Sequence, residues 1–404
     1  MRKFIIPILT ILALFPCGAI RGQGIWQPDI MNFPHFIYLY NNAPTNDERA
    51  GVVREFRQMI DKTGTPITEG DKCYFIYTGQ VDSSANVVGF FNAWKPEDGQ
   101  LQQLGTTGIY FKEYTFPVDA RLDYKFIIDG KWMLDPRNPD KTAGGFGFSS
   151  EMRMPKWKPS DWTIPREDVP PGIVDTLQWN STYLPGERKI YIYRPHDYNP
   201  GEEYPVLYTQ DGLDYIRFGH ILTCADNLIA AGKIHPLIMV LIDPIHRREE
   251  YGLNPDYLKM ISEEILPAIR SNYSVTDDRR LTGILGDSFG GLAAFYVGLE
   301  RPDLFGMIAG QSGHYAYKEN WIMEFAQRMD GDSLYRRPEQ QAFLQVGTFE
   351  RQMQGFDLTQ ASESFRDILK QKRIKVSFVE APEDHSWAFW RRILPDILIK
   401  FYGV

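Results

Sequence analysis

The stretch RRLTGILGDSFGGLAAFYVGLE, residues 279–300, decides the fold. Its first part has the pattern of a buried strand and its second part that of a helix, with Ser288 at the turn between them. Gly286 and Gly290 flank the serine, and glycine permits the tight backbone that a sharp strand-to-helix turn needs. Such a turn projects the hydroxyl above the sheet, beside the first N–H groups of the helix. We therefore predict that Ser288 is a nucleophile and that the Phe289 N–H donates to an oxyanion.

A serine hydroxyl needs a base to take its proton, and α/β-hydrolases place an acid and then a histidine after the serine. His314 and His385 are the histidines that follow Ser288. His385 stands in VEAPEDHSWAFW, between the last apolar strand and the final helix, so we predict that it is the base. A surface or capping histidine is the alternative. His314, in GQSGHYAY, follows another strand end and is expected to form a wall of the pocket.

The acid of the triad is expected after the strand QAFLQV. Glu350 stands at the carboxyl end of that strand and is the first candidate, while Asp357, seven residues further on, is the second. The second oxyanion donor is expected from the loop after the first core strand, in LYTQDGLDY. We predict that this donor is the backbone N–H of Leu213, which follows Asp211 and Gly212.

Residues 176–404 alternate between apolar runs and helical stretches. The apolar runs, such as YPVLYTQ, PLIMVLID and IKVSFVE, are nearly continuous, which is typical of strands buried on both faces. Stretches with helical spacing of apolar residues stand between them, among them PDYLKMISEEILPAIRSNY and LTQASESFRDILKQK. This alternation predicts an α/β domain with a mostly parallel sheet flanked by helices.

The pattern of the sequence is different before residue 155. Residues 23–64 form a predicted helical lead-in, whose helix over residues 46–62 ends at TGTP. Short alternating stretches such as CYFIYTG and DYKFIIDGKWML fill residues 65–155 and predict a small all-β, immunoglobulin-like sandwich. Residues 156–175 are rich in proline and have no regular periodicity, so we expect a linker there.

Residues 1–22 have the layout of a secretory signal peptide, with two basic residues, an apolar run and then small residues. The apolar run from Phe4 to Phe15 is too short for a stable membrane span. Cleavage is expected between Ala19 and Gln23, and lipidation at Cys17 is the alternative. We therefore expect a periplasmic or secreted protein.

The charge and the residue composition argue against several kinds of binding partner and cofactor. A formal net charge of −8, with no long run of Lys or Arg, argues against nucleic acid or an anionic membrane as partner. The seven histidines and three cysteines show no metal-ligand spacing, and no phosphate-binding glycine loop is present, so cofactor-free chemistry is expected. Cys73 and Cys224 fall in different predicted domains and are expected to be small buried residues.

The segments YPVLYTQDGLDY, DNLIAAGKIHPLIMVLID, GDSFGGLAAFYVGLERPDLFG and DHSWAFW together resemble one esterase family of α/β-hydrolases. That family takes in enterochelin esterases and family-1 carbohydrate esterases, such as feruloyl and acetylxylan esterases. The resemblance implies Ser288 as nucleophile and His385 as base, and Glu350 as an acid whose position varies among relatives. RREEY, residues 247–251, resembles a family signature near the active site; a turn closed by ion pairs is the alternative for its side chains.

The segments GFFNAWKPEDGQLQQL and DYKFIIDGKWMLDPRNPD resemble a family-48 carbohydrate-binding module, an early-set sandwich. In members that bind sugar, two tryptophans and a lysine on one face hold the ligand. The resemblance implies that Trp94, Lys125 and Trp132 fill these positions here. KTGTPITEGDKCYFIY is also similar to the N-terminal domain of enterochelin esterases, which implies instead a domain that packs against the hydrolase and shapes its pocket.

These inferences lead to three hypotheses for function. The first is an exported serine esterase that removes feruloyl or acetyl groups from plant-type polysaccharide or oligosaccharide. The second is a periplasmic esterase for an enterochelin-type siderophore lactone, and the third is a non-catalytic glycan-binding protein. Trp321, Trp387 and Trp390 are candidates to line an acyl pocket, with core packing as the alternative.

Overall fold

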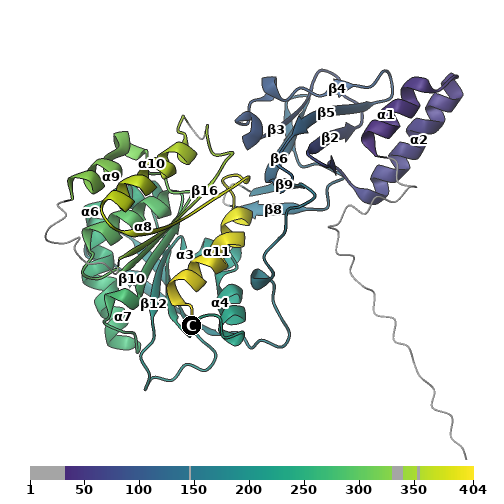
Figure 1. Ribbon diagram of the computed structural model, residues 1–404. Helices are drawn as coiled ribbons and strands as arrows, with labels where there is room; N and C mark the ends of the chain where they lie inside the picture. The colour runs from purple at the N-terminus through teal and green to yellow at the C-terminus, as the bar shows by residue number, and fades with distance from the viewer. Residues whose placement is uncertain (1–31, 145–146, 330–339, 353–354) are drawn as a thin grey trace, which may run out of the picture.

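The computed structural model describes residues 32–144, 147–329, 340–352 and 355–404 (Figure 1). The predicted signal peptide, Cys17 and the first residues of the lead-in lie outside this part of the chain. Within it, no helix has both the length and the apolar character needed to cross a membrane.

A mixed sheet of eight strands forms the centre of the C-terminal part, in the order β10-β11-β13-β12-β14-β15-β16-β17. The strands are β10 (Ile173–Asn180), β11 (Glu187–Arg194), β12 (Val206–Gln210), β13 (Ile238–Ile242), β14 (Thr282–Asp287), β15 (Met307–Gln311), β16 (Gln341–Gly347) and β17 (Lys375–Ala381). The six strands from β13 to β17 in this order are parallel to one another. Strand β11 pairs antiparallel with both of its neighbours, β10 and β13. Every residue of β12, β13, β14 and β15 is buried, as expected for strands covered on both faces.

Helices cover both faces of this sheet (Figure 1). One face packs against α3 (Gly212–Arg217), α4 (Ile221–Ala230) and α11 (Trp387–Tyr402). The other packs against α5 (Arg247–Tyr251), α6 (Pro255–Lys259), the π-helical η4 (Met260–Ile265), α7 (Leu266–Asn272), α8 (Phe289–Glu300), α9 (Tyr317–Arg328) and α10 (Leu358–Gln371). The prediction of an α/β fold for this part is confirmed. The predicted strand at residues 279–285 starts later, because Arg279–Leu281 form a 3-10 turn (η5).

Two smaller antiparallel sheets precede this domain. The first has the order β1-β2-β5-β4 and the second the order β3-β6-β9-β8, with β7 beside β6. Their strands are β1 (Ile67–Glu69), β2 (Lys72–Thr78), β3 (Ala85–Gly89), β4 (Gln102–Gln103), β5 (Ile109–Thr115), β6 (Arg121–Ile128), β7 (Lys131–Met133), β8 (Lys141–Gly144) and β9 (Gly147–Arg153), and short 3-10 turns lie at η1 (Phe90–Asn92) and η2 (Pro96–Asp98). Phe75 on the first sheet and Tyr124 and Met152 on the second contribute to one buried core. We call this unit the sandwich.

Two helices cover the outer face of the first sheet. They are α1 (Phe33–Asn42) and α2 (Asn46–Thr63), and their Phe36 and Phe56 rings stack 3.8 Å apart against that sheet. Thr45 and Glu48 begin α2 with a reciprocal capping box, since each side chain accepts the backbone N–H of the other. The N-terminal region is therefore a sandwich with a helix pair on one side.

The second sheet of the sandwich contacts the α/β domain. Strand β8 contacts α11, and the Phe116 and Phe349 rings lie 5.8 Å apart. The segment that links the two parts contains η3 (Asp161–Thr163), and β10 begins at Ile173, within the predicted linker. Asn227 of α4 donates to the Trp162 and Ile164 carbonyl oxygens, so this segment is packed along the α/β domain.

Candidate active site

Ser288 occupies the turn between β14 and α8 in a conformation that L-residues rarely adopt. Its φ is 52° and its ψ is −120°. The backbone is held from both sides, since the Ser288 N–H donates to the Gln311 carbonyl (2.8 Å) and its carbonyl accepts from the His314 N–H (3.1 Å). A side chain at Gly286 would come within 2.2 Å of the Gly290 carbonyl oxygen, so the turn requires glycine there. This geometry is that of a nucleophile elbow.

Three side chains from separate loops form a hydrogen-bonded relay. His385 Nε2 lies 3.0 Å from Ser288 Oγ, and His385 Nδ1 lies 2.8 Å from Glu350 Oε2. Since a carboxylate can only accept, Nδ1 carries the hydrogen and Nε2 presents its lone pair to the serine. The structure thus brings together the three residues that the sequence predicted for the triad.

The Glu350 carboxylate is fully buried, and its oxygens are occupied by fixed donors. Its Oε1 accepts from Ser312 Oγ (2.7 Å) and from the Gly347 N–H (2.8 Å). The Trp390 indole donates in turn to Ser312 Oγ (2.9 Å). Asp357, the second candidate for the acid, caps α10 by accepting from the Gln360 N–H at 2.8 Å. Its carboxylate therefore serves a helix and not the histidine.

The two predicted oxyanion donors differ in their surroundings. Phe289 is the first residue of α8, where backbone N–H groups have no acceptor within the helix. The Leu213 N–H instead donates to Asp243 Oδ1 at 2.7 Å. The prediction of Leu213 as a free donor therefore needs correction. Asp243 follows the neighbouring strand β13, and its carboxylate lies at the N-terminus of α3, where negative charge is favoured.

The RREEY segment forms ion pairs below the elbow. Arg247 binds Asp211 with two hydrogen bonds of 2.8 and 2.7 Å and lies 3.4 Å from Asp287. Burial and the Asp211 charge raise the pKa of Asp287. Glu250 pairs with the buried Arg188 at 2.6 Å. The ion-pair interpretation of RREEY therefore agrees with the structure, and Arg247 supports the residue that precedes Ser288.

His314 is buried beside the elbow, and its predicted place in a pocket wall stays a prediction. Its ring is 4.7 Å from the Phe289 ring and 4.7 Å from the Phe356 ring. Burial, with a contribution from the nearby His385, lowers the pKa of His314 to about 4. The side chain is therefore neutral at pH 7 and adds no positive charge next to His385.

The three tryptophans considered for an acyl pocket belong mainly to the core. Trp321 stacks on Phe325 at 5.2 Å, and Trp387 packs on Tyr215 at 5.0 Å. Trp390 is buried, and its ring lies 4.9 Å from that of His385. Core packing is therefore their observed role, and Trp390 also supports the relay.

Aromatic rings of the sandwich extend from the relay. Phe90 of η1 lies 6.4 Å from the His385 ring, Trp94 lies 5.7 Å from Phe90, and Trp132 stacks on Trp94 at 6.2 Å. Trp132 is 55% exposed. Lys125 of β6 lies on the same face of its strand as Ile127, which is paired with Trp132. We call Phe90, Trp94 and Trp132 the aromatic row. The sequence did not single out Phe90, because a phenylalanine in GFFNAW has no distinguishing pattern.

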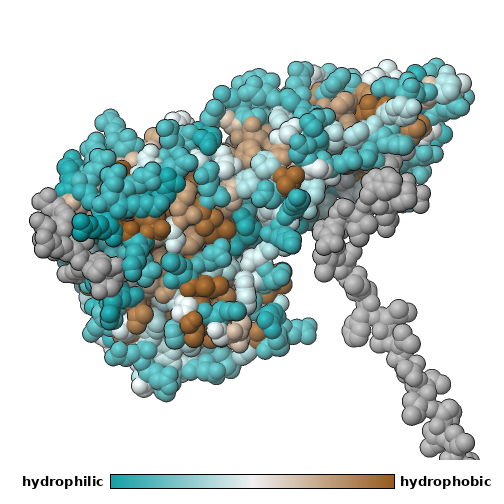
Figure 2. Space-filling view, viewed as in Figure 1, coloured by the Kyte–Doolittle hydropathy of each residue, from teal (hydrophilic) through white to brown (hydrophobic). Residues whose placement is uncertain are grey.

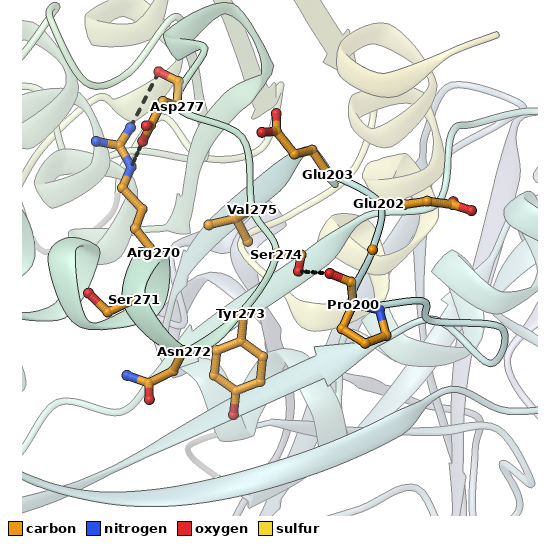
Figure 3. A pocket seen from close by; sticks show the side chains of 11 residues that line it. Pro200, Glu202, Glu203, Arg270, Ser271, Asn272, Tyr273, Ser274, Val275 and Asp277 are labelled. Atoms are coloured by element: carbon orange, nitrogen blue, oxygen red, sulfur yellow. Dashed lines mark hydrogen bonds and ion pairs between the residues drawn. The ribbon is translucent and has the colours of Figure 1, made fainter.

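Figure 3 shows a separate cavity of about 520 Å³, whose lining includes no residue of the relay. Arg270 and Asp277 form an ion pair at its edge, and Ser274 donates to the Pro200 carbonyl. It adjoins Tyr204, just before β12, and so lies at the amino end of the parallel strands. Ser288 and Glu350 lie at the carboxyl end, where α/β enzymes bind substrate. Among the residues described, no cluster of His, Cys, Asp and Glu is arranged to hold a metal ion.

The two acid candidates give a direct prediction. We expect Glu350→Gln to lower kcat by roughly 10³- to 10⁴-fold, because the amide cannot hold the imidazole in the required tautomer. The matched change Asp357→Asn is expected to leave kcat within about twofold, since asparagine caps a helix as well as aspartate. Steady-state hydrolysis of p-nitrophenyl acetate by both variants is the measurement. Equal losses in the two variants would contradict this assignment.

The environment of His314 predicts acid sensitivity. Its pKa of about 4 in the folded protein is below the usual 6.5, so the unfolded chain binds more protons between these values. The free energy of unfolding should fall as pH drops from 7 to 4. In His314→Gln this fall should be smaller than in wild type by about 2 to 3 kcal/mol. Urea unfolding at pH 7 and pH 4 measures the difference. The same pH dependence in both proteins would refute this explanation.

The chain is similar to known proteins in both sequence and structure. An iron(III) enterobactin esterase of Escherichia coli O6:H1 is 32% identical over 189 residues, which are 45% of this chain and 46% of that protein. An endo-1,4-beta-xylanase/feruloyl esterase of Xylanibacter ruminicola is 26% identical over 224 residues, 52% of this chain and 31% of that protein. The chain therefore spans about half the length of the enterobactin esterase that it matches.

A ferric enterobactin esterase from Salmonella typhimurium has a similar structure, with a TM-score of 0.70 over 86% of this chain and 98% of that one, at 20% identity. At this identity the likeness shows a shared fold. In sequence, residues 181–401, more than half of the chain, match the family model described as "Putative esterase". The chain belongs to this esterase family, as its sequence motifs predicted.

Proposed function

We propose that the protein is a serine carboxylic-ester hydrolase. The observation that supports this most directly is the relay of Ser288, His385 and Glu350, with hydrogen bonds of 3.0 and 2.8 Å. A neutral serine becomes nucleophilic when a base accepts its proton as the new bond forms. Family membership supports the same class of reaction.

In the first half of the reaction, Ser288 Oγ attacks the ester carbonyl carbon while His385 Nε2 takes the hydroxyl proton. Glu350 stabilises the imidazolium that results, and the Phe289 N–H donates to the oxyanion. The tetrahedral intermediate then collapses. The alcohol leaves with the proton from Nε2, and the acyl group stays on Ser288.

In the second half, water takes the place of the alcohol. His385 accepts a proton from the water as its oxygen attacks the acyl carbon, and a second tetrahedral intermediate forms. Its collapse returns the proton to Ser288 Oγ and releases the acid. Each cycle therefore consumes one water and needs no cofactor.

For the substrate we propose feruloyl or acetyl esters of plant-type polysaccharide or oligosaccharide, in an exported protein. The aromatic row supports this choice, because the exposed Trp132 ring, stacked on the half-buried Trp94, offers a surface for a sugar or a feruloyl ring. Trp94, Lys125 and Trp132 are the proposed contacts. Figure 2 shows apolar surface on both sides of the junction between the sandwich and the α/β domain.

A siderophore lactone of the enterochelin type is the second candidate. An iron-loaded catecholate is anionic and would favour cations around the pocket. Arg248 lies over the Phe289 ring at 5.9 Å, and Lys318 lies over the Tyr317 ring at 5.5 Å, so two cations are near the elbow. Arg247 is less suited to this role, since it already pairs with Asp211 and contacts Asp287.

A substrate panel separates these candidates. The panel contains methyl ferulate, a feruloylated arabinoxylan oligosaccharide, p-nitrophenyl acetate and a catecholate trilactone, each tested with wild type and Ser288→Ala. We expect the highest kcat/KM on the feruloylated sugar and a loss of at least about 10⁴-fold in kcat for the variant. Preference for the trilactone would favour the siderophore lactone. Activity that survives Ser288→Ala would refute the serine mechanism.

The aromatic row predicts a defect limited to large substrates. We expect Trp132→Ala to raise KM for the feruloylated oligosaccharide by roughly tenfold, the equivalent of about 1.4 kcal/mol of stacking, with little change in kcat. KM for p-nitrophenyl acetate should not change. Tyr38→Ala removes an aromatic ring on α1 that is also exposed (64%) and is the control. A similar effect of both variants would argue against a substrate contact at Trp132.

A further inference from the structure

We propose that Arg121, a sandwich residue, positions the base His385 by holding the two residues on either side of it. Arg121 is the first residue of β6, and its side chain is fully buried. This inference rests on the proposed function, because it concerns the orientation of the proposed base.

The contacts of Arg121 converge on the loop that carries His385. Its Nη1 donates to Asp384 Oδ1 (3.2 Å) and to Ser386 Oγ (2.8 Å). The Arg121 backbone N–H donates to the Pro382 carbonyl (3.1 Å). One residue of the sandwich thus binds the loop before and after the histidine, although it does not contact the imidazole.

Other groups near β6 bind the same loop. The second oxygen of Asp384 accepts from the Asp123 N–H at 2.5 Å. The neighbouring Glu383 accepts from the Trp157 indole at 3.2 Å and forms an ion pair with Arg392. Both Asp384 oxygens thus accept from residues of β6, Arg121 and Asp123, and Ser386 of the loop also hydrogen-bonds this carboxylate.

The charges around Arg121 make it difficult to replace. Asp123, Glu151 and Asp384 all pair with this single guanidinium, and Arg153 also contacts Glu151. Burial and the neighbouring carboxylates raise the pKa of Asp123 to about 7. Removing Arg121 would leave Asp384 as a buried carboxylate without its cation, and such a group moves toward water or takes up a proton. Either change disturbs the backbone on both sides of His385.

A different role for Arg121, simple attachment of the sandwich, makes different predictions. Loss of attachment alone would lower stability and weaken binding of large substrates at the aromatic row. Loss of positioning would lower kcat even for a small ester and would disturb the hydrogen bond between His385 Nδ1 and Glu350. That bond gives a downfield imidazole N–H proton resonance, which reports on the orientation of the base without turnover.

The test compares Arg121→Gln, Arg121→Lys and Asp135→Asn in the full chain. Asp135 is the matched control, because its buried carboxylate accepts from Thr65 (2.8 Å) and Tyr124 (2.7 Å), both within the sandwich. We expect Arg121→Gln to lower kcat on p-nitrophenyl acetate by 10- to 100-fold with KM within threefold, and Arg121→Lys to recover at least a third of the activity. Asp135→Asn should lower the melting temperature but keep kcat within twofold.

The proton spectrum gives the second measurement. We expect the downfield resonance, identified by its loss in His385→Gln, to persist in Asp135→Asn and Arg121→Lys and to broaden or vanish in Arg121→Gln. If Arg121→Gln does not fold, Asp384→Asn provides the same comparison with an isosteric change. Unchanged kcat and an unchanged resonance in the folded variant would overturn the proposal. An inactive wild type that retains the resonance would instead count against the proposed function alone.

Discussion

The hydrogen bond between Glu350 and His385 is the interaction on which the arrangement of the site depends. It places a carboxylate with no solvent exposure next to an imidazole, and that charge needs fixed donors in place of water. Ser312 and the Gly347 N–H supply them. Because Ser288, Ser312 and Glu350 follow the adjacent parallel strands β14, β15 and β16, the sheet itself brings these groups to one edge. Neighbouring strands therefore carry neighbouring members of the hydrogen-bonded relay.

The base is supported in a different way. His385 follows β17, which lies at the edge of the sheet and, among the described strands, pairs with β16 alone. Next to the loop that follows β17 lies the sandwich, whose Arg121 and Asp123 donate hydrogen bonds to Asp384. In this arrangement an edge strand gains the support that a central strand receives from two neighbours. The sandwich is thus part of the framework around the relay.

The parts of the site that sequence could predict are those with a local signal. Ser288 lies between a strand pattern and a helix pattern with glycines at the required positions, and Glu350 and His385 each follow an apolar strand. Leu213 was mispredicted because its partner, Asp243, lies directly after the neighbouring strand β13, far away in the sequence. Arg121 lies 263 residues from Asp384 in the chain, so no local pattern could reveal their contact. The alternation of strands and helices predicted the α/β fold, but not which face of the sandwich meets it.

The relay alone does not select a substrate, because the same atoms would cleave a feruloyl ester or a lactone. Selection must come from groups that touch the substrate away from the carbonyl. The candidates that we propose are the aromatic row, which begins 6.4 Å from His385, and the cations Arg248 and Lys318 near Phe289 and Tyr317. Stacking surfaces favour flat or sugar rings of any charge, whereas the cations favour anionic ligands. Since the aromatic row belongs to the sandwich and the cations belong to the α/β domain, specificity for the two substrate classes would change independently in evolution.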